Sequence, residues 1–210
     1  MRRTIFILVI ILCFLIIGSL SFVYLKLHHQ PDWYSQYNQD SVNVLLKQSR
    51  KIRRSLLINL KKKETVEVSG RDLSSLILSE IKLRSPLKTD KTVKAINTSI
   101  SDKNIIIEMV IDLNQLHRDD FSGRTFRYIE WAKKWVPENI KREFYAQLVI
   151  YPVKKGNMID FSERSVIRIA GVDFPVKEVL NQIGFEKYFI QTDYHLQDFV
   201  LTKDKLVLRD

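Results

Sequence analysis

The sequence predicts an α+β fold, in which an N-terminal transmembrane helix precedes a mostly antiparallel sheet with three or four helices. Three observations support this prediction. An apolar run opens the chain at Ile5–Leu25, apolar residues recur at helical spacing from Val42 to Leu60, and apolar and polar residues alternate over 93–113. A period near 3.6 is typical of helices and a period of 2 is typical of strands, so runs of both kinds favour the α+β class.

The first element, Ile5–Leu25, is long enough to cross a membrane as a helix. Sixteen of its 21 residues are Ile, Leu, Val or Phe, and about 20 apolar residues span the hydrocarbon core of a bilayer. Two alternatives stay open, a removed signal peptide and a buried core helix. Small residues around Ser19 are typical of a cleavage site, but the apolar run continues past them, which favours an uncleaved anchor.

Charges on either side of this segment predict its orientation. Arg2 and Arg3 precede it together with the α-amino group, and only Lys26 follows in its near flank. Positive charges favour the cytoplasmic side. We therefore expect a single-pass protein of the cell membrane, with residues 1–4 as a cytoplasmic tail and the C-terminal domain extracytoplasmic.

The net positive charge of the remaining chain is concentrated in one stretch. After Leu25 the chain has 32 Lys and Arg (the total of 34 less Arg2 and Arg3) against 24 Asp and Glu, and Lys47–Lys63 contains the whole excess of eight with no acidic residue. The cations of this stretch are Lys47, Arg50, Lys51, Arg53, Arg54, Lys61, Lys62 and Lys63.

These cations lie on a predicted amphipathic helix over 41–63, which follows a spacer over 26–40. Near a bilayer, each Lys or Arg contributes up to about 1 kcal/mol of attraction to anionic headgroups. The helix is therefore a candidate membrane-surface or anion-binding element. The alternative is a helix that packs on the core and whose outer face is only solvated.

Two pairs of aromatic residues are candidates for an interfacial or lid position. Trp33 and Tyr34 belong to the spacer, and Trp131 and Trp135 stand four residues apart on a predicted helix over 124–136. Amphipathic rings are enriched at the headgroup level of membranes, and residues at i and i+4 lie on one side of a helix. Packing of the same rings against the domain is the alternative.

The domain over 64–210 is predicted to contain hairpins and short helices. Helices are expected over 73–81, with Ser69 or Asp72 as the N-terminal cap, and over 175–183. A short strand precedes the first of these helices. Two antiparallel hairpins are predicted from alternating runs separated by turn residues, over 93–113 and 144–169, and the chain finishes with runs over 194–201 and 206–208 on either side of a turn at Lys203-Asp204.

Catalytic and metal-binding patterns are absent from the sequence. No His-Glu-x-x-His, Gly-x-Ser-x-Gly or Gly-rich phosphate-loop motif occurs, although each would give a recognisable local signature. The single cysteine, Cys13, excludes an intrachain disulfide and a Cys-based zinc site. We therefore expect no catalytic residues, no metal and no cofactor, and a protein that is not an enzyme.

Two stretches resemble a known family. Val66–Ile81 (VEVSGRDLSSLILSEI) and Leu148–Ile183 are similar to the YpmS-like single-pass envelope proteins of Gram-positive bacteria. The resemblance implies an anchor plus an extracytoplasmic domain, similar to tubular lipid-binding folds in which a curved sheet wraps a helix and holds an apolar ligand. It supplies no catalytic residues, and 117–142 departs from the pattern.

Three functions are compatible with these features. The first is a membrane-anchored, non-enzymatic module that binds lipid or another apolar envelope component. The second is an envelope scaffold that docks a protein partner through the basic helix or the aromatic helix. The third is polyanion binding. Nucleic acid is not favoured as a partner, because the neighbours of the basic residues are Leu and Ile rather than the aromatic residues on which single strands stack.

Overall fold

The computed structural model confirms the α+β class. It describes residues 24–26, 30–37, 40–62, 64–84, 89–117, 126–127, 130–131, 133–134, 136–156, 158–178, 190–191 and 198–209. The predicted membrane-spanning segment 5–25 lies outside this set except for its last two residues. Among the residues that are described, no helix is both long enough and apolar enough to cross a membrane.

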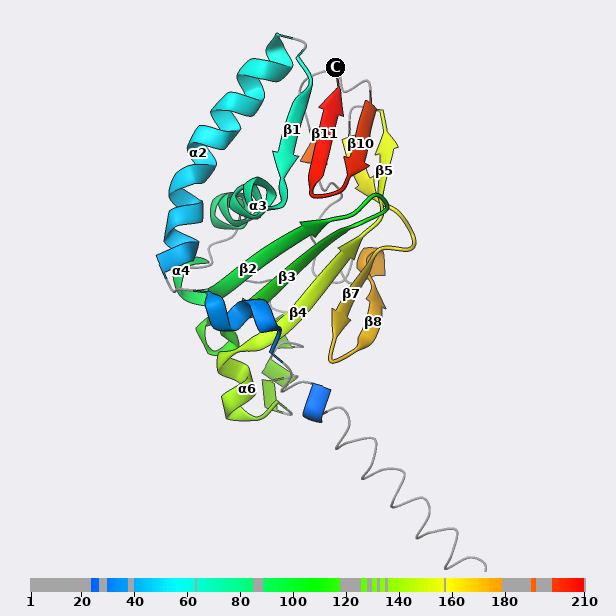
Figure 1. The fold of residues 1–210 in the computed structure, drawn as a ribbon. Helices are drawn as coiled ribbons and strands as arrows, with labels where there is room; N and C mark the ends of the chain where they lie inside the picture. The colour runs from blue at the N-terminus through cyan, green and yellow to red at the C-terminus, as the bar shows by residue number, and fades with distance from the viewer. Residues whose placement is uncertain are drawn as a thin grey trace, which may run out of the picture.

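The described strands form three antiparallel sheets, which corrects the prediction of one sheet (Figure 1). The central sheet has the order β2 (Val93–Ile100), β3 (Ile105–Ile111), β4 (Phe144–Ile150), β7 (Val166–Ile169) and β8 (Val172–Pro175). The second has the order β1 (Val66–Ser69), β11 (Lys205–Arg209) and β10 (Asp198–Thr202). The third has the order β5 (Pro152–Lys155), β6 (Met158–Phe161) and β9 (Ile190–Gln191).

The predicted hairpin over 144–169 exists, but its two arms are divided between two sheets. Far from the turn of the hairpin, β4 pairs with β7 in the central sheet. Next to the turn, β5 pairs with β6 in the third sheet. The division falls at Tyr151, whose carbonyl accepts from Ser162 N (3.0 Å) and whose N–H donates to Ser165 Oγ (3.0 Å). Pro152 follows and has no N–H to donate, so the ladder does not continue straight through this point.

The predicted helix over 175–183 begins later than its proline indicates. Pro175 is the last residue of β8, and the described helical residues start at Val176. A two-residue turn at Ala170 and Gly171 joins β7 to β8, with φ of 52° and 80°. Positive φ at both central residues matches the twist of a hairpin. The sequence does not predict β8 as a strand, because Ala-Gly lacks the Asn-Gly or Asp-Gly signal that is typical of such turns.

Two long α-helices lie along one side of the strands (Figure 1). The helices within the described residues are the 3-10 helices η1 (Asp32–Gln36) and η2 (Leu113–Gln115) and the α-helices α2 (Asp40–Lys61), α3 (Gly70–Arg84), α4 (Thr89–Thr92) and α6 (Glu138–Arg142). α3 packs between α2 and the central sheet. The predicted helices over 41–63 and 73–81 are thus present as α2 and α3.

The hydrophobic core lies where these two helices meet the central sheet and β1–β11. Its side chains come from one face of each element, as the helical and strand periods require. The most buried members include Val42, Leu45 and Leu60 of α2, Leu73 and Leu78 of α3, Ile96, Ile105, Ile107 and Ile150 of the central sheet, and Val68 and Leu206 of β1 and β11.

The start of α3 is fixed by a side-chain cap and by a close approach to β2. Asp72 N donates to Ser69 Oγ (3.2 Å), while Ser69 N and Ser69 Oγ donate to Asp72 Oδ2 (3.3 and 2.7 Å). This reciprocal pattern confirms the predicted cap and satisfies the free N–H groups of the first turn. At Gly70, an added Cβ would stand 2.1 Å from the Thr98 carbonyl oxygen, so only glycine fits.

Candidate functional site

α2 has one face in the core and an opposite face in solvent. Val42 and Leu45 are buried, and Lys47, Lys51 and Arg54 are exposed. These three cations follow one another at i, i+4 and i+7, and residues at such spacing lie on one side of a helix. The amphipathic pattern predicted from the sequence is therefore present, with the cations aligned along the outer side.

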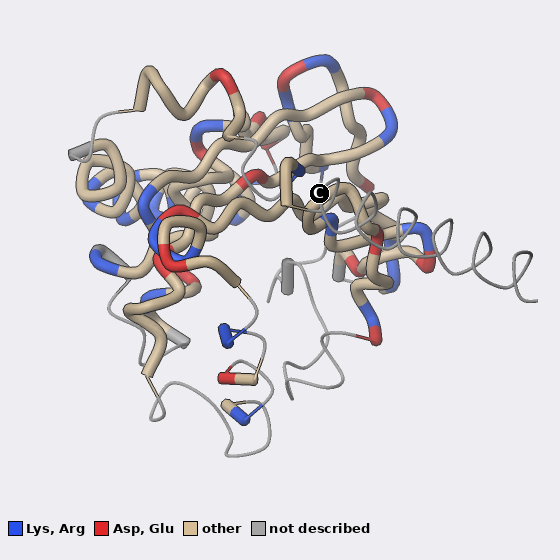
Figure 2. The backbone as a smooth tube through the Cα atoms, turned by 90° about the horizontal axis from the view of Figure 1, so that it is seen from below, with Lys and Arg blue, Asp and Glu red and all other residues tan. Residues whose placement is uncertain are grey.

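Large apolar side chains interrupt this row of cations. Val44, Leu57 and Ile58 are 40%, 45% and 43% exposed, and Ile58 continues the row four residues after Arg54. We call this surface the basic face, and it consists of Val44, Lys47, Arg50, Lys51, Arg54, Leu57, Ile58, Lys61 and Lys62. Elsewhere in the described chain, positive and negative residues are interspersed (Figure 2).

Arg53 differs from the other cations of α2 because its side chain binds another helix of the same domain. Its guanidinium forms an ion pair with Glu80 of α3 and reaches Ser79 Oγ at 3.4 Å. Among the ion pairs of the described residues, this is the one that involves α2. Arg53 therefore joins two helices and is less available to an external anion. Lys63, the last of the predicted cations, lies outside the described residues.

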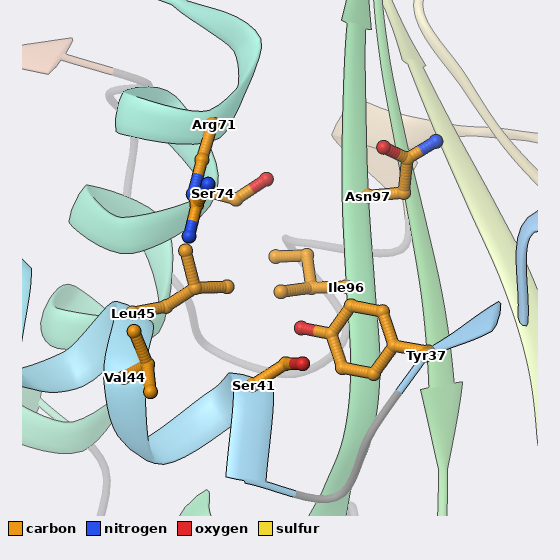
Figure 3. Close-up of a pocket in the computed structure, with 8 residues that line it drawn as sticks. All are labelled: Tyr37, Ser41, Val44, Leu45, Arg71, Ser74, Ile96 and Asn97. Carbon is orange, nitrogen blue, oxygen red and sulfur yellow. The ribbon is translucent and has the colours of Figure 1, made fainter.

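A pocket of about 520 Å³ lies beside the N-terminal end of the basic face (Figure 3). It is formed by the segment before α2, the first turns of α2 and α3, and the edge strand β2. Its lining residues are Tyr37, Ser41, Val44, Leu45, Arg71, Ser74, Ile96 and Asn97. Val44 belongs both to the pocket and to the basic face, so the two surfaces are continuous.

The polar groups that point into the pocket are hydrogen-bond donors. Figure 3 shows Arg71 and the hydroxyls of Tyr37 and Ser41 directed into the space between α2, α3 and β2. The Asn97 amide instead donates to Glu108 at 3.1 Å. No Asp or Glu is among the residues that line this pocket, so its polar part favours negative charge.

The Tyr37 hydroxyl is buried, and within the described part of the chain no group is in hydrogen-bonding geometry with it. Burial raises the pKa of this phenol, and the Ile96 backbone and the charge of Arg71 partly oppose the shift. These two groups are therefore close to the hydroxyl without satisfying it. The pocket thus contains a buried donor beside a guanidinium.

The spacer aromatics contact the folded domain. Trp33 packs edge-on against Tyr37 of the same spacer with ring centroids 5.8 Å apart, and Tyr37 packs against the core. Tyr34 donates a hydrogen bond to Glu143 Oε1 (3.2 Å), and Gln30 bonds to the same carboxylate. Packing on the domain was one of the two alternatives, and an interfacial role of these rings stays a prediction.

The second aromatic pair is described in part. Trp131 is 62% exposed, whereas Trp135 lies outside the described residues. A shared lid or membrane foot of these two rings therefore also stays a prediction.

Tyr34 gives the domain a measurable alkaline sensitivity. Burial and the nearby Glu143 carboxylate raise the pKa of Tyr34 to about 12. A raised folded-state pKa contributes stability that is complete below the unfolded value near 10 and is lost as pH rises through 12. Melting temperatures of Tyr34→Phe are therefore expected to fall less than those of the unsubstituted protein between pH 10 and 12. Equal slopes in this range would contradict the assignment.

The face of the central sheet opposite the core carries a polar row across all five strands. Directly paired residues form it, and these are Asn97, Glu108, Gln147, Arg168 and Asp173. Glu108 accepts hydrogen bonds from Asn97 (3.1 Å), Tyr145 (2.5 Å) and Gln147 (3.2 Å). Arg168 binds Asp173 through two bonds of 2.6 and 3.0 Å.

This row makes the outer sheet face unsuited to an apolar ligand along its line, because its carboxylates and amides would lose water. Burial and the bond to Glu108 raise the pKa of Tyr145, which keeps its hydroxyl a donor. Within the described residues, no three His, Cys, Asp or Glu side chains are grouped as metal ligands would be. The basic face and the adjoining pocket are therefore the candidate site.

The fold and this site define an α+β protein with a cationic helix face beside a donor-lined pocket. Comparison of the chain with models of protein families, with curated proteins and with solved structures found no match.

Sequence reasoning identified the cations of the basic face but missed the pocket. Arg71 and Ser74 are followed more than 20 positions later by Ile96, and only packing of α3 on β2 brings them to Tyr37. One signal was available: Arg71 directly follows the Ser-Gly that starts a helix, where a cation opposes the helix dipole. A cation in that unfavourable place indicates a use outside local helix stability.

Proposed function

We propose that this protein is a membrane-tethered, extracytoplasmic and non-enzymatic module that binds anionic lipid through the basic face of α2. The observation that supports this function most directly is the alignment of exposed cations and exposed apolar side chains on one helix side. Such a face is attracted to anionic headgroups by its charge and inserts its apolar residues at the acyl boundary. A merely solvated helix face gains nothing from exposing Leu57 and Ile58.

The predicted anchor makes even weak surface binding effective. The spacer over 26–40 has 15 residues, so at about 3.3–3.6 Å per residue it reaches at most about 50 Å. α2 is thereby held close to the bilayer in which Ile5–Leu25 is expected to lie. Because Gln30, Tyr34 and Tyr37 of this spacer contact the domain, the free part of the tether is shorter than this limit. A short tether gives an effective concentration in the millimolar range, so modest affinity per cation is sufficient.

The anchor and its orientation can be tested with the single cysteine of the chain. Cys13 lies within the apolar run, so a membrane-impermeant maleimide is expected to label it only after detergent is added. In a Cys13→Ser, Lys103→Cys variant, the new thiol lies in an exposed turn and is expected to react from outside intact cells. Recovery of a soluble chain that begins near Phe22 would contradict the proposal.

A second candidate function uses the same surface for a protein partner. Leu57 and Ile58 are large exposed apolar side chains on the basic face, and an acidic envelope protein would complement that face. Crosslinking in cells separates the two functions, because a scaffold yields one stoichiometric protein partner whereas lipid binding yields none. The resemblance to YpmS-like proteins supports the tethered arrangement that both functions share.

A further inference from the structure

We infer that the pocket between α2, α3 and β2 binds an amphiphile with one anionic headgroup, a carboxylate or a phosphate, which Arg71 and the Tyr37 hydroxyl hold. The inference rests on the proposed function, because the membrane surface is the source of such a ligand. It adds a specific binding site for one ligand molecule to the basic face, which is proposed to attract many headgroups without binding any one of them specifically.

Charge complementarity identifies the headgroup. Arg71 points into the pocket, and within the described residues no carboxylate forms an ion pair with it. The neighbouring Asp72 is already used by the cap of α3. A guanidinium binds a carboxylate or phosphate through two parallel hydrogen bonds, and the pocket offers it no acidic competitor.

The Tyr37 hydroxyl supplies the second independent observation. It is buried without a hydrogen-bond partner among the described residues, and a buried donor left unpaired costs stability. An anion bound to Arg71 would also accept from this hydroxyl and from Ser41, both of which face the same space. The site therefore lacks an acceptor, which is what an anionic headgroup provides.

The rest of the pocket is suited to an apolar chain. Leu45 and Ile96 form a buried wall, and Val44 lies at the edge toward the basic face. A volume of about 520 Å³ falls within the range of about 300–1,000 Å³ for small-molecule sites. It accommodates a headgroup and the first part of an acyl chain, with the remainder leaving along the exposed apolar residues of α2.

The experiment uses the full chain in nanodiscs of phosphatidylcholine and a photoreactive diazirine analogue of palmitate. Labelled protein is digested with trypsin, and the label is located by mass spectrometry. We expect it in the peptides 27–47 and 95–103, which contain the pocket residues of the α2 region and of β2. The analogue of the corresponding alcohol, which lacks the anion, is expected to label these peptides at least tenfold less.

Three variants sharpen the test. Arg71→Gln is expected to weaken labelling at least tenfold, which is the effect of losing hydrogen bonds to a charged group. Tyr37→Phe is expected to weaken labelling severalfold while the melting temperature of the ligand-free protein stays the same or rises, since it removes an unpaired donor. Lys103→Gln removes the same charge from an exposed turn and is expected to label normally.

Several outcomes would overturn the inference. These are equal labelling by the alcohol analogue, label located in other peptides, and normal labelling of Arg71→Gln. If inorganic phosphate competed as strongly as unlabelled palmitate, the ligand of the pocket would be a free anion and not an amphiphile. The proposed function is tested by a different measurement. Arg71→Gln leaves the cations of the basic face in place, so this variant is expected to bind anionic vesicles normally even though its pocket is impaired.

Discussion

Replacing Lys47, Lys51 and Arg54 by glutamine is expected to weaken the proposed binding to anionic membranes about 100-fold. Each of these exposed cations contributes about 1 kcal/mol near an anionic surface, and a total of about 3 kcal/mol corresponds to roughly two decades in a binding constant. The partition of the full chain, held in phosphatidylcholine nanodiscs, onto added phosphatidylglycerol vesicles measures this effect. Raising the salt from 0.1 to 1 M should also weaken binding by the unsubstituted protein, since the screening length falls from about 10 to 3 Å.

The matched control removes three charges from elsewhere on the surface. Lys103, Arg164 and Lys203 lie in exposed turns between strands, and their combined replacement by glutamine changes the net charge by the same amount. This variant is expected to bind vesicles almost as the unsubstituted protein does. If both triple variants lost binding equally, net charge rather than the basic face would be responsible, and the proposed function would have to be abandoned.

Neither triple variant is expected to change the stability of the fold. In the described residues, the three cations of the basic face make no ion pair, whereas Arg53 of the same helix does. Substitutions at exposed, unpaired positions usually change the free energy of unfolding by no more than about 0.5 kcal/mol. Thermal melting of the variants checks this and separates loss of binding from loss of structure.

Gly70→Ala is expected to destabilise the domain by about 3 kcal/mol or more. The new Cβ would lie 2.1 Å from the Thr98 carbonyl oxygen and 3.1 Å from its carbon. Both are backbone atoms of β2, which cannot turn away as a side chain can. Overpacking typically costs about 1–3 kcal/mol, and a fixed backbone places this substitution at or above the upper end. Such a loss is a large part of a total stability of about 5–15 kcal/mol.

A second glycine provides the control for this prediction. Gly156 has a φ of 59°, and among the described residues no neighbouring atom lies within 4 Å of an added Cβ, so alanine there meets only the conformational cost of about 1–2 kcal/mol. Denaturant unfolding of the two variants should therefore differ clearly. Equal destabilisation would show that the approach of α3 to β2 is not what requires glycine at position 70.

Periodicity and turn chemistry predicted the elements whose partners are close in the sequence. The β2–β3 hairpin follows from the alternation on either side of the turn at Ser101–Asn104, and α2 follows from the spacing of Val42, Leu45 and Leu60. Both signals are local, and the structure contains both elements.

The division of strands among three sheets could not be predicted in the same way. It depends on Ser162 and Ser165 binding the backbone of Tyr151, which are contacts across more than ten residues. Turn residues indicate that a chain reverses, but they do not indicate which sheet each arm joins. The alternation over 144–169 therefore predicts one continuous hairpin, whereas its arms belong to two sheets.

Only the part of the candidate site that lies within one segment can be predicted from the sequence. A charge count finds the cations of α2, but it cannot distinguish Arg53, whose partner Glu80 is 27 positions away on α3. The pocket depends on Tyr37, Arg71 and Ile96 meeting in space, and none of these residues carries a motif. Sites assembled from separate segments become visible only once helix and strand packing is known.

The pairing of β1 with β11 has a consequence for how the domain is made. Lys205 Nζ donates to Glu67 Oε2 at 2.5 Å as a diagonal pair across these strands, although 138 positions separate the two residues. During synthesis, the edge of β1 stays without its partner strand until β11 has been made. An unpaired strand edge is a template for association with other chains, so β1 is exposed to such association until the hairpin of β10 and β11 has formed.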